Sequence, residues 1–194
     1  MSRYYTFIYQ YVMQLEAQYL SGLLLFKPTL YYDSRGYFFE SYHQEKYKAL
    51  GLDVSFIQEN QSLSKKGTIR GLHYQLAPHA QAKLVRVVQG VIWDVVVDLR
   101  KEMDTFGKWQ GFLLSSENQH QLFVPKGFAH GFIALSSEAI LAYKCDAYHF
   151  PDAEQGIHFQ DPTLHIPWAD YAKPQIVSSR DAALPLFQAA VFNF

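Results

Sequence analysis

The sequence contains little cysteine and no apolar run long enough to cross a lipid bilayer. Its single cysteine, Cys145, cannot form an internal disulfide, which is typical of proteins in a reducing compartment. The opening residues, MSRYYTFIYQYVM, lack the basic start, the apolar core and the small-residue cleavage site of a secretory signal. We therefore expect a cytoplasmic protein that has no membrane partner.

An excess of charge of either sign is also missing. Lys and Arg total 17 and Asp and Glu total 18, so the formal net charge is −1. General nucleic-acid binding needs a basic surface, which this composition does not supply, so no nucleic-acid partner is expected. The balance still permits an anionic small molecule held by a few focused cations.

Linkers, internal repeats and low-complexity tracts are absent between Leu20 and Leu184. The chain has 194 residues, 49% of them hydrophobic, which is enough for one domain with a sizeable core. We predict an N-terminal extension over residues 1–19 and a single domain over residues 20–194.

Strand signals dominate the chain. Short apolar stretches separated by Gly, Ser, Asn and Pro are typical of a sandwich or barrel rather than of alternating βαβ units. The run KLVRVV, then Gln89 and Gly90, then VIWDVVVDLR predicts a hairpin of two β-branched strands. Helices are expected only in SYHQEKYKALG, closed by Gly51, and after Ser178. The predicted fold class is all-β, a sandwich or jelly-roll barrel with a few short helices.

Two histidines lie in motifs that resemble those of the cupin barrels. Residues 67–73 match the opening of the first motif, and residues 125–130, PKGFAH, match the second, Pro-x-Gly-x-x-His. Metal-binding cupins continue the first motif with a second histidine and a glutamate, but here Gln75 holds that position and no glutamate follows before Gly90. A transition metal usually needs three or four protein ligands, and His79 lies in a loop expected to face solvent. No metal site is predicted.

One cupin family is similar over nearly the whole chain. The segments FIQENQSLS, GTIRGLHYQ, AQAKLVRVVQG, VVDLR, FGKW, LSSENQHQLFVPKGFAHGF, YKC, DP and SSRD occur in order and at near-constant spacing. Together they resemble the dTDP-4-dehydrorhamnose 3,5-epimerases of dTDP-L-rhamnose biosynthesis, from about residue 23 to about residue 184. The resemblance implies a metal-free enzyme that epimerises C3 and C5 of dTDP-4-dehydro-6-deoxy-D-glucose and so forms dTDP-4-dehydro-L-rhamnose.

Epimerisation of a 4-keto sugar needs three kinds of group. The hydrogens on C3 and C5 are both alpha to the carbonyl, so a base can remove either one to give an enolate. An acid must then return a proton on the opposite face. Acid–base catalysis contributes roughly a hundred- to ten-thousandfold, so a cation or donor must also hold the developing oxyanion. No redox cofactor is required, and no cofactor is predicted.

His73 suits the base because a neutral imidazole is poised near neutral pH. The family resemblance places its partner at Asp181, in SSRD where the family has Ser-x-Lys-Asp, and the acid at Tyr143, in YKC. Lys83, in AQAKLV, is assigned to the oxyanion, with Arg70 on the same segment as His73. Without the resemblance, Tyr143 would be assigned to the core and Lys83 to a strand edge.

The resemblance also maps substrate binding onto charged and polar residues, among which arginine forks suit a pyrophosphate. The mapped residues are Arg35, Glu40, Gln58, Glu59, Asn60, Arg70, Lys83, His130, Glu154 and Arg180. The family has an aromatic residue six positions after the catalytic tyrosine, stacked on the thymine. Here this position is His149, so either its ring stacks or the register shifts to Tyr148. The family is dimeric, so a homodimer is expected.

Other functions stay open at this stage. A related enzyme could epimerise C3 or C5 alone or isomerise the ketone, although the presence of both His73 and Tyr143 disfavours the isomerase. A metal-dependent cupin oxygenase is opposed by Gln75 and by the missing glutamate. A non-catalytic sugar-nucleotide-binding cupin is opposed by the survival of the whole acid–base set.

Overall fold

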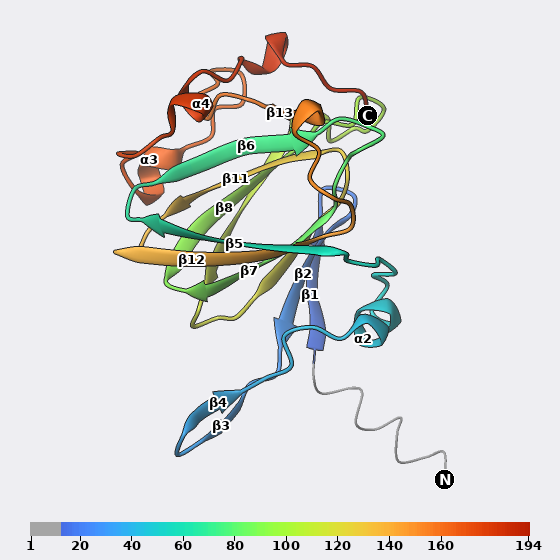
Figure 1. Ribbon diagram of the computed structural model, residues 1–194, viewed down its shortest axis with the longest axis vertical. Helices are drawn as coiled ribbons and strands as arrows, with labels where there is room; N and C mark the ends of the chain where they lie inside the picture. The colour runs from blue at the N-terminus through green and yellow to red at the C-terminus, as the bar shows by residue number, and fades with distance from the viewer. Residues whose placement is uncertain (1–12) are drawn as a thin grey trace.

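The computed structural model describes residues 13–194 as two antiparallel β-sheets packed face to face, with smaller elements at their ends (Figure 1). The first sheet contains, in spatial order, β1 (Met13–Tyr19), β2 (Leu23–Pro28), β10 (Gln121–Val124), β7 (Lys83–Gln89), β12 (Glu138–Cys145) and β5 (Gln58–Lys65). The second contains β13 (Glu154–Gly156), β6 (Ile69–Gln75), β11 (Phe128–Ala134), β8 (Val91–Asp98) and β9 (Trp109–Ser115). The all-β fold class predicted from the sequence is confirmed.

The remaining elements are short. Strands β3 (Tyr31–Asp33) and β4 (Gly36–Phe38) form a hairpin that projects from the body of the molecule (Figure 1). The helical segments are α2 (Gln44–Ala49), η2 (Pro151–Ala153), α3 (Trp168–Tyr171), α4 (Ser179–Ala182) and η3 (Phe187–Ala189). The helices predicted before Gly51 and after Ser178 are therefore confirmed. In the part of the chain that the structure describes, every helix is too short or too polar to cross a membrane.

Apolar side chains fill the space between the two sheets. Val85 and Leu141 of the first sheet pack with Ile92, Val96 and Phe132 of the second, and none of the five is more than 4% exposed. Burying one such side chain contributes roughly 1.5–3 kcal/mol to folding. This layer holds the two sheets at a fixed separation.

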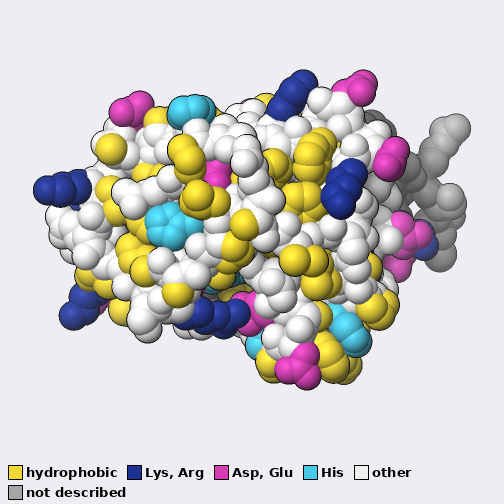
Figure 2. Space-filling model, turned by 90° about the horizontal axis from the view of Figure 1, so that it is seen from above, with side chains coloured by type: hydrophobic (Ala, Val, Ile, Leu, Met, Phe, Trp, Pro, Cys, Tyr) yellow, Lys and Arg dark blue, Asp and Glu magenta, His cyan; other side chains and the backbone are white. Residues whose placement is uncertain are grey.

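The C-terminal segment covers the outer face of the second sheet. Trp93 and Val95 of β8 point away from the inter-sheet core and pack with Ile157, Leu164 and Trp168. In Figure 1 this segment, orange to red, lies above β6, and it brings α4 beside that strand. On the face seen in Figure 2, basic and acidic side chains are interspersed and are not gathered into one basic patch.

The hairpin predicted around Gly90 is wrong. Strand β7 pairs with β10 and β12 in the first sheet, whereas β8 pairs with β9 and β11 in the second. The chain crosses between sheets at Gly90, which has φ +81°, and a Cβ there would lie 2.2 Å from the carbonyl oxygen of Glu138. Two β-branched runs around a glycine fit this crossing as well as a hairpin, because the local sequence does not show which strands each run pairs with.

The N-terminal boundary predicted after residue 19 falls inside the sheet. Residues 1–12 lie outside the described residues, but Met13–Tyr19 form β1 and pair antiparallel with β2. Only Met13 of this strand is fully buried, so the run shows little of the alternation that marks a strand. The structured part of the chain therefore includes at least these seven residues of the expected extension.

Candidate active site

A cavity lies between the two sheets and is lined mainly by polar side chains. It consists of two adjoining parts with volumes of about 330 and 410 Å³. His73, Lys83 and Tyr143 line both parts. His73 lies on β6 of the second sheet, whereas Lys83 and Tyr143 lie on β7 and β12 of the first. The imidazole and the phenol therefore reach the cavity from opposite walls.

His73 and Asp181 form a hydrogen-bonded pair at one wall. His73 Nε2 lies 2.8 Å from Asp181 Oδ1, and the side chains are 26% and 5% exposed. Burial raises the pKa of Asp181, but hydrogen bonds and charge from His73, with further bonds from the Gly71 N–H and Ser178, outweigh it and leave the pKa below its ordinary value. An ionised Asp181 favours the proton on Nε2 of a neutral His73, which leaves Nδ1 free to accept a proton.

Local sequence explains how Asp181 reaches His73. Ser178 caps α4, and its side-chain oxygen accepts a hydrogen bond of 3.0 Å from the Asp181 N–H. Gly71 has φ +119°, and a Cβ there would lie 2.5 Å from Gly131 Cα. The glycine therefore permits the close approach of β6 to β11 and places its N–H 3.2 Å from Asp181 Oδ2. The short helix predicted after Ser178 serves to orient this carboxylate.

Lys83 and Tyr143 form the opposite wall. Lys83 Nζ lies 5.9 Å from the centre of the Tyr143 ring, and Lys83 makes no ion pair with any carboxylate in residues 13–194. Burial lowers the pKa of Lys83, although Cys145, Glu154 and Asp94 oppose this change. Burial also raises the pKa of Tyr143, so the phenol is protonated at neutral pH. The wall thus offers a phenol that can donate a proton and, beside it, a buried lysine with no carboxylate partner among residues 13–194.

His130 lies beside His73 on the neighbouring strand and lines the larger part of the cavity. Its Nε2 lies 2.8 Å from Oδ2 of the fully buried Asp94. The Nε2 atoms of both histidines therefore contact separate carboxylates. Among the described residues, no group of three His, Cys, Asp or Glu side chains is placed to hold a metal ion.

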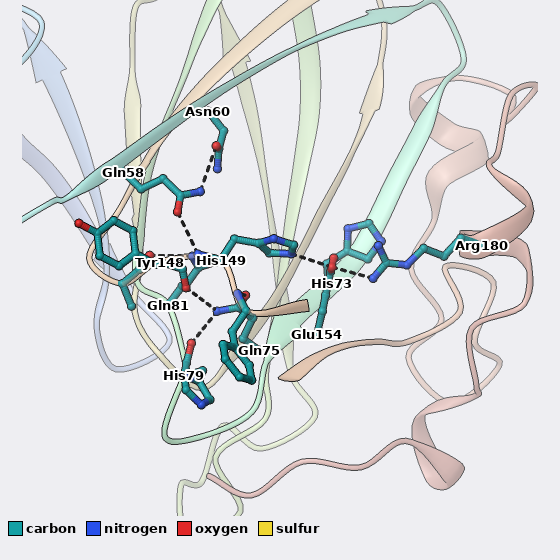
Figure 3. Close-up of polar contacts among 12 residues, drawn as sticks. Gln58, Asn60, His73, Gln75, His79, Gln81, Tyr148, His149, Glu154 and Arg180 are labelled. Carbon is teal, nitrogen blue, oxygen red and sulfur yellow. Dashed lines mark hydrogen bonds and ion pairs between the residues drawn. The ribbon is translucent and has the colours of Figure 1, made fainter. Parts of the chain in front are cut away.

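A second charged cluster lies at the smaller part of the cavity (Figure 3). Glu154 Oε2 is 2.9 Å from His149 Nε2 and 2.8 Å from an Nη atom of Arg180. Burial raises the pKa of Glu154, but hydrogen bonds from His149 and Arg180 outweigh it, and the pKa stays below its ordinary value. Gln58 and Asn60 of β5 line the same part and are joined by a hydrogen bond of 3.1 Å.

Comparison with known proteins agrees with this geometry. The family model described as dTDP-4-dehydrorhamnose 3,5-epimerase matches residues 17–189. A relative of that name from Salmonella typhimurium is 46% identical over 175 residues, which cover 90% of this chain and 95% of the relative. The chain belongs to the dTDP-4-dehydrorhamnose 3,5-epimerase family. The family membership predicted from the sequence is confirmed, and the protein is an epimerase, a class of isomerase.

Solved structures of dTDP-4-dehydrorhamnose 3,5-epimerase family members also match. The enzyme from Bacillus anthracis, with TDP and pyrophosphate bound, gives a TM-score of 0.88 at 46% identity and covers 91% of this chain and 100% of that chain. The enzyme from Legionella pneumophila, in complex with dTDP-4-keto-L-rhamnose, gives 0.86 at 44% identity and covers 91% and 94%. A 3'-monoepimerase from Streptomyces bikiniensis, in complex with dTDP-quinovose, gives 0.81 at 33% identity and covers 88% and 87%.

Three of the residues mapped from the dTDP-4-dehydrorhamnose 3,5-epimerase family lie away from the cavity. Arg35 is exposed on the β3–β4 hairpin and pairs with Asp33. Glu40 pairs with Lys46 just before α2. Glu59 lies on β5 between Gln58 and Asn60, faces the opposite side of the strand and pairs with Lys144. The other mapped residues line one or both parts of the cavity: Gln58, Asn60, Arg70, Lys83, His130, Glu154 and Arg180.

The structure separates the two candidates for the stacking position. His149 lines the cavity, whereas Tyr148 is 69% exposed and does not line it. In Figure 3 the Tyr148 ring points away from His73 and Glu154. The His149 ring already contacts Glu154, so its orientation is fixed by a carboxylate.

Sequence reasoning did not assign Gln75, Gln81 or Asp94 to the site. Gln75 and Gln81 line the smaller part of the cavity, and Asp94 holds His130. Alternation along β6 puts Gln75 on the same face as His73, a signal present in the sequence. Asp94 stands in the apolar run VIWDVVVD, and a carboxylate buried in such a strand needs a polar partner. This position is a second signal in the sequence.

Proposed function

We propose that the cavity binds dTDP-4-dehydro-6-deoxy-D-glucose and that His73 and Tyr143 epimerise both C3 and C5 through enolate intermediates. The observation that carries this proposal is the placement of His73 and Tyr143 on opposite walls of one cavity, with Lys83 beside the phenol. Inversion at carbon needs a base and an acid on opposite faces of the sugar. Redox and nucleophilic reactions do not require an acid and a base on opposite faces of the substrate.

In each inversion, Nδ1 of His73 removes the proton from the carbon alpha to the ketone. The electron pair of the broken C–H bond moves onto the carbonyl oxygen, and Lys83 stabilises the resulting enolate. Tyr143 then returns a proton to the same carbon from the opposite face. The tyrosine regains a proton from solvent and His73 releases one, so each turnover is neutral in protons and electrons and needs no cofactor.

The nucleotide is proposed to occupy the smaller part of the cavity and the sugar the larger part. Arg70 and His130 line the larger part beside His73, whereas His149 and Glu154 line the smaller part. Arg180, in α4, lines the larger part and contacts Glu154 of the smaller part. It is suited to the pyrophosphate because a guanidinium binds phosphate oxygens in pairs. Glu154 compensates the charge of Arg180 when the anion is absent.

Proton NMR of the keto-sugar substrate in heavy water tests the reaction. We expect deuterium to enter at both C3 and C5, because the base and the acid reach the same sugar from opposite walls. Exchange at C3 alone would make the protein a mono-epimerase like the Streptomyces bikiniensis relative. Exchange at neither carbon would leave only sugar-nucleotide binding.

We propose further that the active enzyme is a homodimer in which Arg35 and Glu40 bind the nucleotide of the second copy. Both residues lie outside the cavity of their own chain. The hairpin that carries Arg35 also exposes aromatic side chains, with Tyr32 73% and Phe38 71% exposed. Aromatic surface of this kind is typical of a protein interface.

Mixed dimers test the contribution of the second copy. Arg35→Ala and His73→Ala are each expected to have low activity alone, but co-expression is expected to restore up to half of the wild-type rate per mixed dimer. One site of that dimer then has its own His73 and the other copy's Arg35. If Arg35 acts within its own chain, both sites stay defective and co-expression restores nothing.

The cytoplasmic location stays a prediction. Cys145 is buried and forms no disulfide, which agrees with it.

A further inference from the structure

The loop that follows β12, residues 147–150, forms one wall of the smaller cavity through His149. Its backbone is held by three glutamine side chains, and Figure 3 shows all three. The side-chain amide of Gln81 donates to the Ala147 carbonyl at 2.8 Å, and the Gln58 side-chain oxygen accepts from the His149 N–H at 2.9 Å. The Gln75 side-chain oxygen accepts from the Phe150 N–H at 2.7 Å.

Gln75 makes more contacts than the other two glutamines. It is 5% exposed, and its side-chain nitrogen donates to the carbonyl of His79 at 2.6 Å and to that of Tyr148 at 3.4 Å. The ring of Phe150 stacks on the ring of His79 at 3.8 Å, with 5° between the planes. Gln75 therefore joins the loop at His79 to the loop at 147–150 and leaves neither free to move alone.

We propose that Gln75 and Gln81 are positioning residues that hold residues 147–150 in the conformation that binds the nucleotide. Neither is among the residues that the family resemblance maps to binding. The inference rests on the proposed placement of the nucleotide in the smaller part of the cavity. A loop that side chains already hold in place loses little conformational entropy when the ligand binds. The free-energy cost of binding is therefore smaller and the affinity is higher. Proton transfer at His73 does not depend on this loop.

The chemistry of the Gln75 amide explains why a glutamine occupies the position. It accepts one backbone hydrogen bond and donates to two carbonyl oxygens. A glutamate of the same shape would still accept from Phe150 but would direct a charged oxygen at the two carbonyls. A protonated carboxyl could donate to only one of the two carbonyls, so Gln75→Glu removes at least one donated hydrogen bond with almost no change in volume.

The test measures dTDP affinity by titration calorimetry together with KM and kcat on the keto-sugar substrate. Gln75→Glu is expected to weaken dTDP binding and raise KM, each by roughly tenfold, the effect of one lost hydrogen bond with an unpaired carbonyl. The value of kcat is expected to stay within about threefold, because ligand binding is changed and acid–base chemistry is not. Gln81→Met, which loses one hydrogen bond at a less buried position, is expected to change both values in the same direction.

Gln121→Glu is the matched control. Gln121 is 1% exposed, donates to the carbonyl of Ser41 at 2.9 Å and accepts from the Tyr47 hydroxyl at 2.9 Å, and it does not line the cavity. The same change of amide to carboxylate there is expected to lower the melting temperature and to leave dTDP affinity unchanged. If it weakens dTDP binding as much as Gln75→Glu does, the effect is general destabilisation and the proposal is wrong.

His149→Ala tests separately whether the nucleotide binds in the smaller part of the cavity, on which the role of Gln75 and Gln81 depends. Weaker dTDP binding in this variant, with wild-type binding in Gln75→Glu and Gln81→Met, would overturn the inference and keep the placement. Unchanged binding in His149→Ala would overturn the placement, and the inference with it. If Gln75→Glu fails to fold, Gln81→Met decides: weaker dTDP binding at unchanged kcat supports the proposal, and unchanged binding overturns it.

Discussion

Replacement of His73 by alanine is expected to abolish both solvent exchange and formation of the inverted product, with a loss of roughly two to four orders of magnitude in turnover. His73 supplies the free ring nitrogen that removes the proton, so without it no enolate forms. The measurement is deuterium incorporation and product formation by proton NMR on the same sample. His158→Ala is the matched control, because His158 lies outside the cavity, and it should retain wild-type activity.

Asp181→Asn extends this test to the partner of the imidazole. The amide would present its NH₂ group to Nε2 of His73 and favour the tautomer with the proton on Nδ1, which cannot act as a base. The turnover of Asp181→Asn is expected to lie between the turnover of the wild type and that of His73→Ala, with exchange and inversion reduced together.

For His73→Ala itself, wild-type exchange would show that another group is the base.

Tyr143→Phe is expected to lose most inverted product, again by roughly two to four orders of magnitude, while solvent exchange continues. The enolate can still form in this variant, and His73 can return a proton only to the face from which it was taken. Deuterium then enters with the original configuration, which NMR distinguishes from the inverted product. Product loss together with retained exchange identifies the second proton carrier.

The control for Tyr143→Phe is Tyr171→Phe. Tyr171 is 47% exposed, stacks on Trp93 and lies outside the cavity, so its hydroxyl should have no effect on either measurement. Unchanged inversion in Tyr143→Phe would assign the acid to a different residue or to water. Loss of exchange equal to that in His73→Ala would mean that Tyr143 is needed to form the enolate.

The parts of the fold that could be predicted depend on local patterns. The β-rich class, α2 and α4 follow from alternation, turn residues and caps that lie within a few positions of one another. The hairpin at Gly90 could not be assigned in this way, because the partners of β7 and β8 come from distant segments. The same holds for β1, whose exposed edge position leaves only Met13 fully buried.

The site shows a similar division. Family motifs identified His73 and Asp181, whose positions are 108 residues apart in the chain but 2.8 Å apart in space. Spacing alone does not connect them. Gln75 and Gln81 have no charge and no reactive group, so only the positions of their backbone partners indicate a role. The family resemblance mapped Arg35 to substrate binding, but the position of Arg35 in a single chain, outside the cavity, does not explain such a role.

The distribution of the proton carriers over two sheets links reactivity to the thickness of the apolar layer. The base is carried by one sheet and the acid by the other. The space left for the sugar ring is therefore the distance between the sheets less the lengths of the His73 and Tyr143 side chains. Facing sheets lie about 10 Å apart when their core is filled by side chains. A displacement of about 1 Å at a reacting centre can lower a rate by roughly a hundredfold. Val85 and Val96, which do not line the cavity, thus act as spacers, and the volume of those side chains determines whether both faces of the ring can be reached at once.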